Sequence, residues 1–321
     1  QYEPVPHAPP SQQTLYAIVY DDDNLYVAIK ALDSIPAEIV RRISRRDAID
    51  GDWVAIAIDS YEDKMTSFEF FVSASGSKRD VRRSESSGQD DTWDPVWETK
   101  TSLQPEGWYA EIRIPYSQLR FGKKKTYRWG LQVARQIYRL QEVSFWQPVD
   151  KASSQFVAHF GTLLGIHDIS PGKEAEVVPF ALSQLTLTEK EAGNPFATGR
   201  SAKASMGVDG KVGLTNDLTL NFTINPDFGQ VEADPSNVNL TNFETYFDEK
   251  RPFFVEGSNI YHYPFDITNN ERNKIFYSRR LGREPQFSYD SEEDEYVRAP
   301  GRTNILGAVK ISGKTSKGTS L

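Results

Sequence analysis

Cysteine is absent from this chain of 321 residues, and methionine and histidine are scarce, with two and four copies. Without cysteine there is no disulfide framework, no thiol nucleophile and no thiolate metal site. The four histidines lack the spacing of metal ligands and are scattered along the chain at positions 7, 159, 167 and 262. The chain also has no GxSxG, HExxH, GxGxxG or P-loop motif. The sequence therefore lacks the signatures of the common metal-dependent, nucleotide-binding and nucleophilic enzymes.

An excess of basic residues is also missing. The net charge is −8, whereas nucleic-acid binding through phosphate contacts needs clustered Lys and Arg. No apolar run approaches the roughly 20 residues of a membrane-spanning helix. Aromatic residues, in contrast, make up 12% of the chain, which favours β architecture because Phe, Tyr and Trp fit pleated surfaces. The length suggests about two domains.

The first half of the chain carries many short alternating segments separated by turn residues. The predicted strands lie at or within residues 16–20, 25–31, 47–59, 66–73, 107–114, 127–135, 143–146 and 161–165, and another ends near 101. The polar, charged segment 79–91 is predicted to be a solvated loop. This pattern is typical of an antiparallel β-sandwich, which we assign to residues 1–166, followed by a linker at 167–173 that contains Pro and Gly.

The second half, 174–321, has longer candidate strands at residues 176–187, 202–213, 217–225, 273–279 and 303–312. Several of them alternate apolar with polar or small residues, and short and long connections alternate between them, as in an outer-membrane β-barrel. A barrel needs about eight strands at minimum, and this half supplies fewer. We therefore expect the first strands of a barrel, in a fragment cut at both ends.

A long irregular segment, Asn225–Gly257, combines acids, bases and aromatics. Long loops are usually functional or disordered, and this one is too aromatic to be disordered. We expect it to be an ordered barrel loop or an insertion that faces the lumen. Its charges are expected to neutralise one another in a structural network, because unpaired buried charge is costly; they are Glu249, Lys250, Arg251 and Glu256.

The six tryptophans all lie in the first half, and indole rings can stack on the C–H faces of sugars. Trp108 and Trp129 are embedded in strands and are predicted to be core residues. Trp93 and Trp97 follow a polar segment and could stand at the rim as a binding platform, although core or edge packing is the alternative. The candidate glycan-binding set is Trp53, Trp93, Asp94 and Trp97.

Aspartates flank the predicted strand that ends at Asp59. Asp47, Asp50 and Asp52 could bind calcium, while solvation of turns and strand ends is the plainer interpretation, and the sequence indicates no other cofactor. The turn at Asp21–Asn24 offers the same choice between a calcium site and turn chemistry. Carboxylate pairs that could serve a hydrolase occur throughout such an acidic chain, but nothing singles one out. We expect a binding protein rather than an enzyme.

Several stretches of the first half resemble the family 9 carbohydrate-binding module, a β-sandwich, in the form fused to large outer-membrane β-barrel proteins of Bacteroidota-type bacteria. The stretches are YDDDNLYVAIKALDS (20–34), RRDAIDGDWVAIAIDSYEDKMTSFEFFVSASGSKRD (45–80), WDPVWETKT (93–101), GWYAEIRIPYSQLRF (107–121) and RWGLQVARQI (128–137). In carbohydrate-binding relatives two tryptophans clamp the sugar. Trp93 and Trp97 fall in a plausible region for such a clamp, without a residue-by-residue match.

The second half resembles the DUF5916-type domain that follows the module in those proteins. The resemblance is carried by INPDFGQVEADPSNVNLTNFETYFDEKRPFFVEG (224–257) and IFYSRRLGR (275–283). It implies a protein of the outer membrane or cell surface of a Gram-negative bacterium. The expected partners are a polysaccharide or other glycan, the outer membrane and further outer-membrane proteins, with no nucleic acid among them.

Three hypotheses of function follow. The first is a non-catalytic surface protein with a glycan-binding sandwich. In the second, the sandwich docks a partner in outer-membrane assembly, secretion or uptake, and its tryptophans are core residues. The third is a carbohydrate-active enzyme, which requires two carboxylates about 5–10 Å apart in one cleft.

Overall fold

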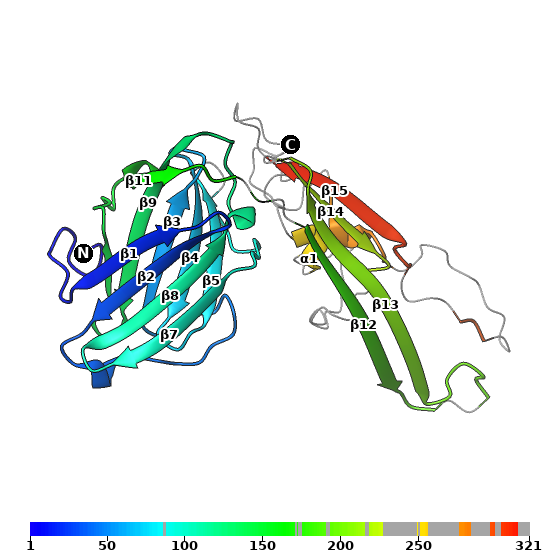
Figure 1. Cartoon of the computed structure of the whole chain (residues 1–321). Helices are drawn as coiled ribbons and strands as arrows, with labels where there is room; N and C mark the ends of the chain where they lie inside the picture. Colours follow the sequence, from blue (N-terminus) through cyan, green and yellow to red (C-terminus); the bar gives the residue numbers. More distant parts are fainter. Residues whose placement is uncertain are drawn as a thin grey trace. The chain divides into compact units, whose positions relative to one another are not determined.

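A computed structural model describes residues 1–85, 88–170, 172, 175–190, 193–215, 218–226, 249, 251–255, 276–283, 296–298 and 303–313. In this part of the chain antiparallel strands dominate, which confirms the predicted all-β class. The chain divides into two compact units, the first chiefly residues 1–174 and the second chiefly residues 175–313 (Figure 1). None of the described helices is long and apolar enough to cross a membrane.

The first unit consists of two antiparallel sheets. The smaller has the order β1 (Thr14–Tyr20), β2 (Asn24–Leu32), β8 (Gly107–Pro115) and β7 (Glu98–Gln104). The larger has the order β10 (Glu142–Phe145), β9 (Thr126–Ile137), β3 (Trp53–Asp59), β4 (Thr66–Ser73), β5 (Lys78–Ser84) and β6 (Gly88–Asp90), and β11 (Gly161–His167) also pairs with β9. Short 3-10 helices occupy Pro36–Glu38, Tyr116–Gln118, Tyr138–Leu140 and Val157–His159.

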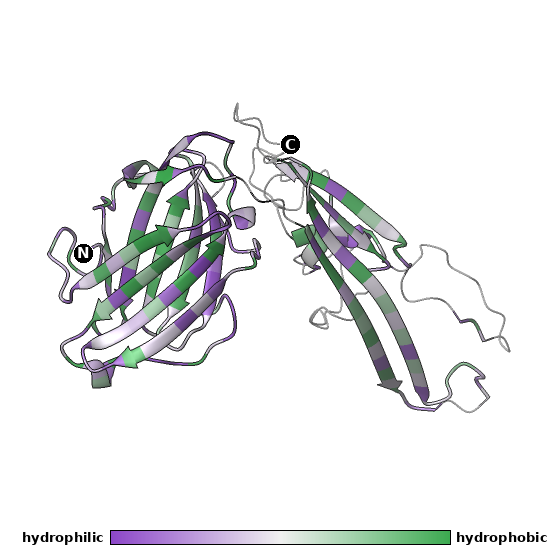
Figure 2. Ribbon diagram, viewed as in Figure 1, coloured by the Kyte–Doolittle hydropathy of each residue, from purple (hydrophilic) through white to green (hydrophobic). Residues whose placement is uncertain are grey.

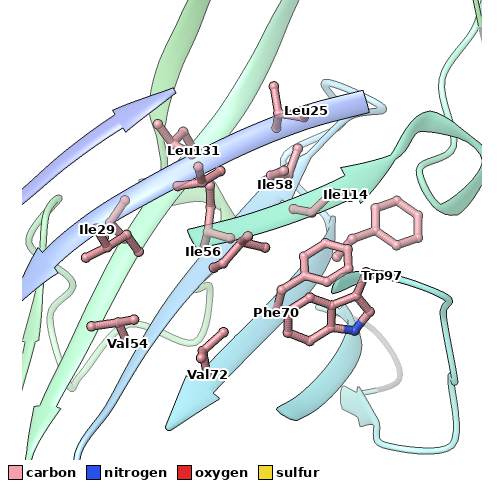
Figure 3. Packing of buried hydrophobic residues seen from close by; sticks show 14 of the residues in the cluster. Leu25, Ile29, Val54, Ile56, Ile58, Phe70, Val72, Trp97, Ile114 and Leu131 are labelled. Atoms are coloured by element: carbon pink, nitrogen blue, oxygen red, sulfur yellow. The ribbon is translucent and has the colours of Figure 1, made fainter. Parts of the chain in front are cut away.

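Alternation of apolar residues builds one core from these strands, because successive side chains of a strand point to opposite faces. Leu25 and Ile29 of β2 and Ile114 of β8 are fully buried together with residues of β3, β4 and β9 (Figure 3). Each large apolar side chain buried in this way stabilises the fold by about 1.5–3 kcal/mol. The partners from β3, β4 and β9 include Val54, Ile56, Ile58, Phe70, Val72 and Leu131.

The predicted solvated loop at residues 79–91 is instead made of strands β5 and β6, in which Asp80 and Val81 are buried. Their charged side chains find partners across the sheet. Arg82 lies 2.7 Å from Asp90, and Arg83 lies 2.5 Å from Glu69. The sequence is misleading here because residues that form cross-strand ion pairs give β5 and its neighbour β6 the composition of a loop.

The predicted hairpin turn at Asp21–Asn24 is confirmed. The Oδ1 atom of Asp21 accepts hydrogen bonds from the backbone N–H groups of Asp23 (2.9 Å) and Asn24 (2.7 Å). The N–H of Asp23, the hydroxyl of Tyr26 and the N–H of Asn24 together lower the pKa of this exposed carboxyl. Turn chemistry therefore accounts for these acidic residues.

Residues 167–173, the predicted linker, include Ile169, which is buried in the first unit. The hydroxyl of Tyr127 donates a hydrogen bond of 3.0 Å to the carbonyl of Ile169. The chain thus stays packed on the sandwich for some residues after β11 ends.

The second unit contains a sheet in the order β12 (Ala175–Leu187), β13 (Arg200–Gly213), β14 (Leu218–Ile224) and β15 (Gly307–Gly313) among its described residues. Strands β14 and β15 pair directly, although a long segment separates them in sequence. A helical turn, α1 (Pro252–Val255), contacts β14. Four of the five predicted strands are confirmed.

The prediction of a strand at residues 273–279 is wrong in the part that the structure describes, where Ser278–Arg280 form a 3-10 helix, η7. The guanidinium of Arg251 donates to the carbonyl oxygens of Ser278 (2.6 Å) and Leu281 (3.0 Å). These carbonyls therefore bind a side chain instead of a neighbouring strand.

The register of the β12–β15 sheet gives its two faces different side chains. One face is almost wholly apolar or small, and the other is mixed, with polar and charged residues beside Val178, Phe180 and Leu182 of β12. On one face, apart from Arg200 at the first residue of β13, the side chains are apolar or small, and many are well exposed: Val177, Leu185, Leu187, Met206, Ile224, Val309 and Ile311. On this face the ring of Phe222 covers Gly210, where any larger residue would collide with it. We call this the apolar face.

The opposite, polar face carries the charged residues Glu176, Lys203, Asp209, Lys211 and Lys310. Thr219, Asn221 and Thr223 of β14 lie on it and are buried. The Nζ of Lys310 donates to the carbonyl of Phe253 in α1 (2.6 Å) and lies 5.0 Å from its ring centroid. Hydrophobic and hydrophilic residues interleave along these strands (Figure 2). The β12–β15 sheet thus buries polar side chains and exposes apolar ones.

Candidate functional site

The predicted tryptophan platform is not formed, because Trp93 and Trp97 are 8% and 2% exposed. The ring of Phe70 lies 5.6 Å from Trp93 and 5.3 Å from Trp97, edge-on in both cases. Burial alternates along WDPVW, so that both tryptophans point inward while Asp94 and Val96 point outward. The alternative of core packing is correct for this pair.

The surroundings of Trp97 form a structural network. Its Nε1 donates to Oδ1 of Asp80 at 2.9 Å, and the guanidinium of Arg46 lies 2.7 Å from the same carboxylate. Arg46 also pairs with the exposed Asp94 at 2.5 Å. Burial raises the pKa of Asp80 to about 6, although the hydrogen bond from Trp97 and the charge of Arg46 oppose the shift. Trp97 therefore stabilises the sandwich from within its core, and the exposed Asp94 makes a surface ion pair with Arg46.

The three aspartates predicted to bind calcium do not converge. Asp50 accepts from Arg42 at 2.9 Å, and Asp52 accepts from the backbone N–H groups of Val40 (3.0 Å) and Tyr138 (2.5 Å). Oδ1 of Asp47 faces the N–H of Asp80 at 3.4 Å. Among the described residues, no group of three His, Cys, Asp or Glu side chains could hold a metal ion. These carboxylates accept hydrogen bonds from backbone N–H groups and from Arg42, which agrees with the plainer of the two interpretations and not with a calcium site.

The structure describes two of the four residues of the predicted charge cluster, Glu249 and Arg251. Arg251 is buried and pairs with Glu249 at 2.6 Å, and it also donates to the two carbonyls of the η7 segment. Lys250 and Glu256 lie outside the described residues. The Glu249–Arg251 pair is a neutralised structural contact, as buried charge requires.

Trp53, the remaining candidate, lines a groove on the outward face of the larger sheet of the sandwich. The cross-strand register places Phe145, Ala134, Ala55 and Phe71 in one row over β10, β9, β3 and β4. Ala57 belongs to the adjacent row. Because alanine carries only a methyl group, the surface sinks between the two phenylalanines. The groove has a volume of about 460 Å³, within the range of about 300–1,000 Å³ that is typical of ligand sites.

Aromatic rings form two walls of this groove. On one side the rings of Trp53 and Phe71 lie 5.2 Å apart in an edge-to-face arrangement. On the other side Phe145 lies 5.2 Å from Tyr2 and 5.4 Å from Phe156. Such contacts hold aromatic rings in defined orientations.

Polar side chains hold the groove in shape. Glu69 is buried on the floor and accepts from Ser67 (2.9 Å) and from Nε of Arg83 (2.5 Å). The guanidinium of Arg83 lies 4.6 Å from the ring of Phe156, whose backbone N–H donates to Glu85 at 2.7 Å. Further polar residues line the groove: Arg79, Gln89, Gln132, Asp150, Ser153, Ser154 and Gln155.

Sequence reasoning missed Tyr2, Phe71, Phe145 and Phe156 because it considered only tryptophan as a sugar platform. A usable signal was present in β3, WVAIAID, whose outward positions read Trp53, Ala55 and Ala57. Small residues at successive outward positions leave room above a sheet, and a large aromatic at the end of the row borders that space.

Comparison with known proteins adds one family match. Residues 177–321 match the model of a family described as a domain of unknown function, DUF5916. Among curated proteins no match was found.

Two solved structures of a family 9 carbohydrate-binding module from Caldicellulosiruptor kristjanssonii are similar to about half of the chain. The complex with glucose is 18% identical, with a TM-score of 0.37 over 49% of this chain and 78% of that one. The complex with cellotriose is also 18% identical, with a TM-score of 0.36 over 51% of this chain and 84% of that one. Identities and TM-scores this low carry no argument about a ligand. Any inference about what the first unit binds therefore rests on the chemistry of the groove.

Proposed function

We propose that the first unit is a non-catalytic glycan-binding module whose ligand lies in the groove. The observation that carries this proposal is the pair of aromatic walls facing each other across a floor of alanines. Aromatic faces pack against the apolar C–H faces of sugar rings. The amide, carboxylate and guanidinium groups beside them can both donate to and accept from hydroxyls. A groove with this lining suits a ring-shaped ligand rich in hydroxyl groups.

The carboxylates of the groove favour binding over hydrolysis. Glu69 is engaged by Ser67 and Arg83, and one oxygen of Glu85 accepts from the N–H groups of Phe156 and Val157. The third carboxylate of the groove, Asp150, accepts from the N–H of Ala152. A glycoside hydrolase needs one carboxyl to donate a proton and a second to act as base or nucleophile. Carboxylates that hold the walls in place are poorly suited to these roles.

Burial of all six tryptophans, together with a large exposed apolar patch elsewhere, would favour the partner-docking alternative. Trp146, however, is 42% exposed, and Trp53 is half-buried beside the groove. A concave site with aromatic walls fits a small ligand better than the flat patch expected of a docking surface. The groove therefore favours the glycan hypothesis.

Binding is tested by titrating the full chain, in mild detergent, with a panel of glucan, xylan, mannan and chitin oligosaccharides while tryptophan fluorescence is recorded. We expect saturable binding of at least one series, and its loss in Trp53→Ala and Phe145→Ala. Trp146→Ala, which removes an exposed tryptophan that does not line the groove, serves as the matched control. A folded protein that binds no sugar, or a Trp53→Ala variant that binds like the parent chain, would refute the proposal.

We also propose that the β12–β15 sheet belongs to an outer-membrane β-barrel, which would place the protein at the surface of a Gram-negative bacterium. The supporting observation is the exposed apolar face opposite a polar face that is partly buried, which is the polarity of a barrel with lipid outside. Strands β12 and β13, with 13 and 14 residues, exceed the roughly 9–11 that span a bilayer.

Membrane insertion is tested by expressing the full chain in a Gram-negative host and washing the membranes with alkaline carbonate. An inserted sheet stays in the membrane pellet, whereas a peripherally bound protein is released. Release of the whole protein into the wash would overturn the membrane proposal and leave the glycan proposal intact.

A further inference from the structure

A second, smaller cavity adjoins the groove. Its volume is about 240 Å³, and Asp47, Ala48, Ile49 and Asp91 line it together with three residues of the groove. The shared residues are Trp53, Phe71 and Arg79. Because one set of side chains borders both spaces, a ligand can pass from one to the other along the outward face of the sheet.

The shared residues form a ridge of defined geometry. The rings of Trp53 and Phe71 meet at 72°. The guanidinium of Arg79 lies 5.1 Å from the centroid of Phe71, its cross-strand neighbour, and Asp91 holds it at 2.9 Å. Two contacts fix this guanidinium, so its orientation does not depend on a ligand. The ridge therefore presents an aromatic surface and a positioned donor between the two spaces.

The smaller cavity suits a single sugar unit. Its volume falls below the range of about 300–1,000 Å³ that is typical of independent ligand sites. Carboxylate oxygens of Asp47 and Asp91 provide acceptors, and Arg79 provides donors, for the hydroxyls of one ring. Ala48 and Ile49 add apolar surface for its C–H groups. The cavity is therefore better suited to be an additional subsite of the groove than a separate ligand site.

We propose that the ligand is an oligosaccharide of at least two units, which crosses the Trp53–Phe71–Arg79 ridge and places one unit in the smaller cavity. This inference rests on the proposed glycan binding. It specifies in addition the minimum length of the ligand and the residues that would contact its second unit. Asp47 and Ala48 line only the smaller cavity, whereas Ala57 lines only the groove, so the two spaces can be altered separately.

The test compares oligosaccharides of one, two, three and four units from the glucose, xylose and mannose series, by calorimetric titration of the full chain. We expect affinity to rise about fivefold to tenfold from one unit to two or three, the gain that one added aromatic contact supplies. In Ala48→Trp, which fills the smaller cavity, this gain should vanish while affinity for one unit is unchanged. Ala57→Trp, which fills the groove, should abolish binding of every length.

A matched control is Ala17→Trp, which makes the same change at an exposed position of β1 in the other sheet. It should keep both the affinity and the length dependence. If the parent chain binds one unit as tightly as four, or if Ala48→Trp keeps the gain, the second subsite is refuted while glycan binding stands. If no series binds, the glycan proposal fails, and the inference with it.

Discussion

The larger sheet of the sandwich and the β12–β15 sheet both place alternate residues of a strand on opposite faces, but the large apolar side chains are buried in the first sheet and exposed in the second. In the sandwich, Val54, Ile56 and Ile58 of β3 are fully buried. In the second unit, Met206 and Val309 are 74% and 68% exposed, while Thr223 on the other face is buried. Alternation thus assigns residues to faces but does not say which face meets protein. Whether a face is buried depends on what covers it, which is the other sheet and the loops in the sandwich.

The largest effect is expected in the sandwich core. Trp97→Ala removes a buried indole and leaves Asp80 without one of its donors. We expect the free energy of unfolding to fall by about 3–5 kcal/mol, as for other buried aromatics replaced by alanine. Chemical denaturation of the parent and variant chains measures this difference. Val96→Ala, at an exposed neighbouring position, should change it by less than about 0.5 kcal/mol. Equal effects would contradict the assigned burial.

The second prediction concerns the apolar face of the second unit. Met206→Arg puts a charge in the middle of that face and should cost about 2–4 kcal/mol if lipid covers it. Ser205→Arg, one residue away on the polar face, should cost much less. Folding into liposomes, followed by denaturant titration, measures both. If both substitutions are tolerated equally, lipid does not cover the apolar face.

A third, smaller effect concerns the pH dependence of the sandwich. The folded pKa of Asp80, about 6, exceeds the ordinary 3.8, so the folded state binds this proton more tightly than the unfolded state. The associated stability is fully present below pH 3.8 and is lost as the pH rises through about 6. The loss is on the order of 2–3 kcal/mol, by the conversion of pKa shifts into free energy.

Asp80→Asn should remove this loss, since asparagine does not titrate and can still accept from Trp97. Unfolding free energies of the two proteins, measured from pH 4 to pH 7, should therefore diverge in slope across that interval. Burial also raises the pKa values of Asp47, Asp52 and Asp59, but these groups are present in both proteins, so the difference in slope reports chiefly on Asp80. Parallel curves would show that Asp80 titrates normally.

The smallest effect on folding is expected at the floor of the groove. Ala134→Leu adds a side chain to open space, so the free energy of unfolding should change by about 0.5 kcal/mol or less. Affinity for the sugar identified by the panel should nevertheless fall at least about tenfold, because the added side chain occupies the ligand's place. Ligand titration and denaturation of the same sample separate the two quantities. Unchanged affinity would place the ligand elsewhere.

Local chemistry was sufficient to predict much of the fold. The alternation at 66–73 coincides with β4, and the acids at Asp21–Asn24 form the predicted turn. Residues 79–91 escaped prediction because their arginines pair with Glu69, Asp90 and Asp91 across neighbouring strands, and the order of charges along the chain does not show which of them will pair. Long-range ion pairs of this kind become visible only when the strands lie side by side.

The sequence by itself determined that the chain is β-rich, that its two halves differ in strand length and alternation, and which residues of a strand share a face. These properties follow from backbone geometry and are local. Only the tertiary structure decided that Trp93 and Trp97 pack against Phe70, and that the groove lies over Ala55, Ala57 and Ala134. A groove is made where side chains of several strands meet, and no single strand encodes which residues will face each other there.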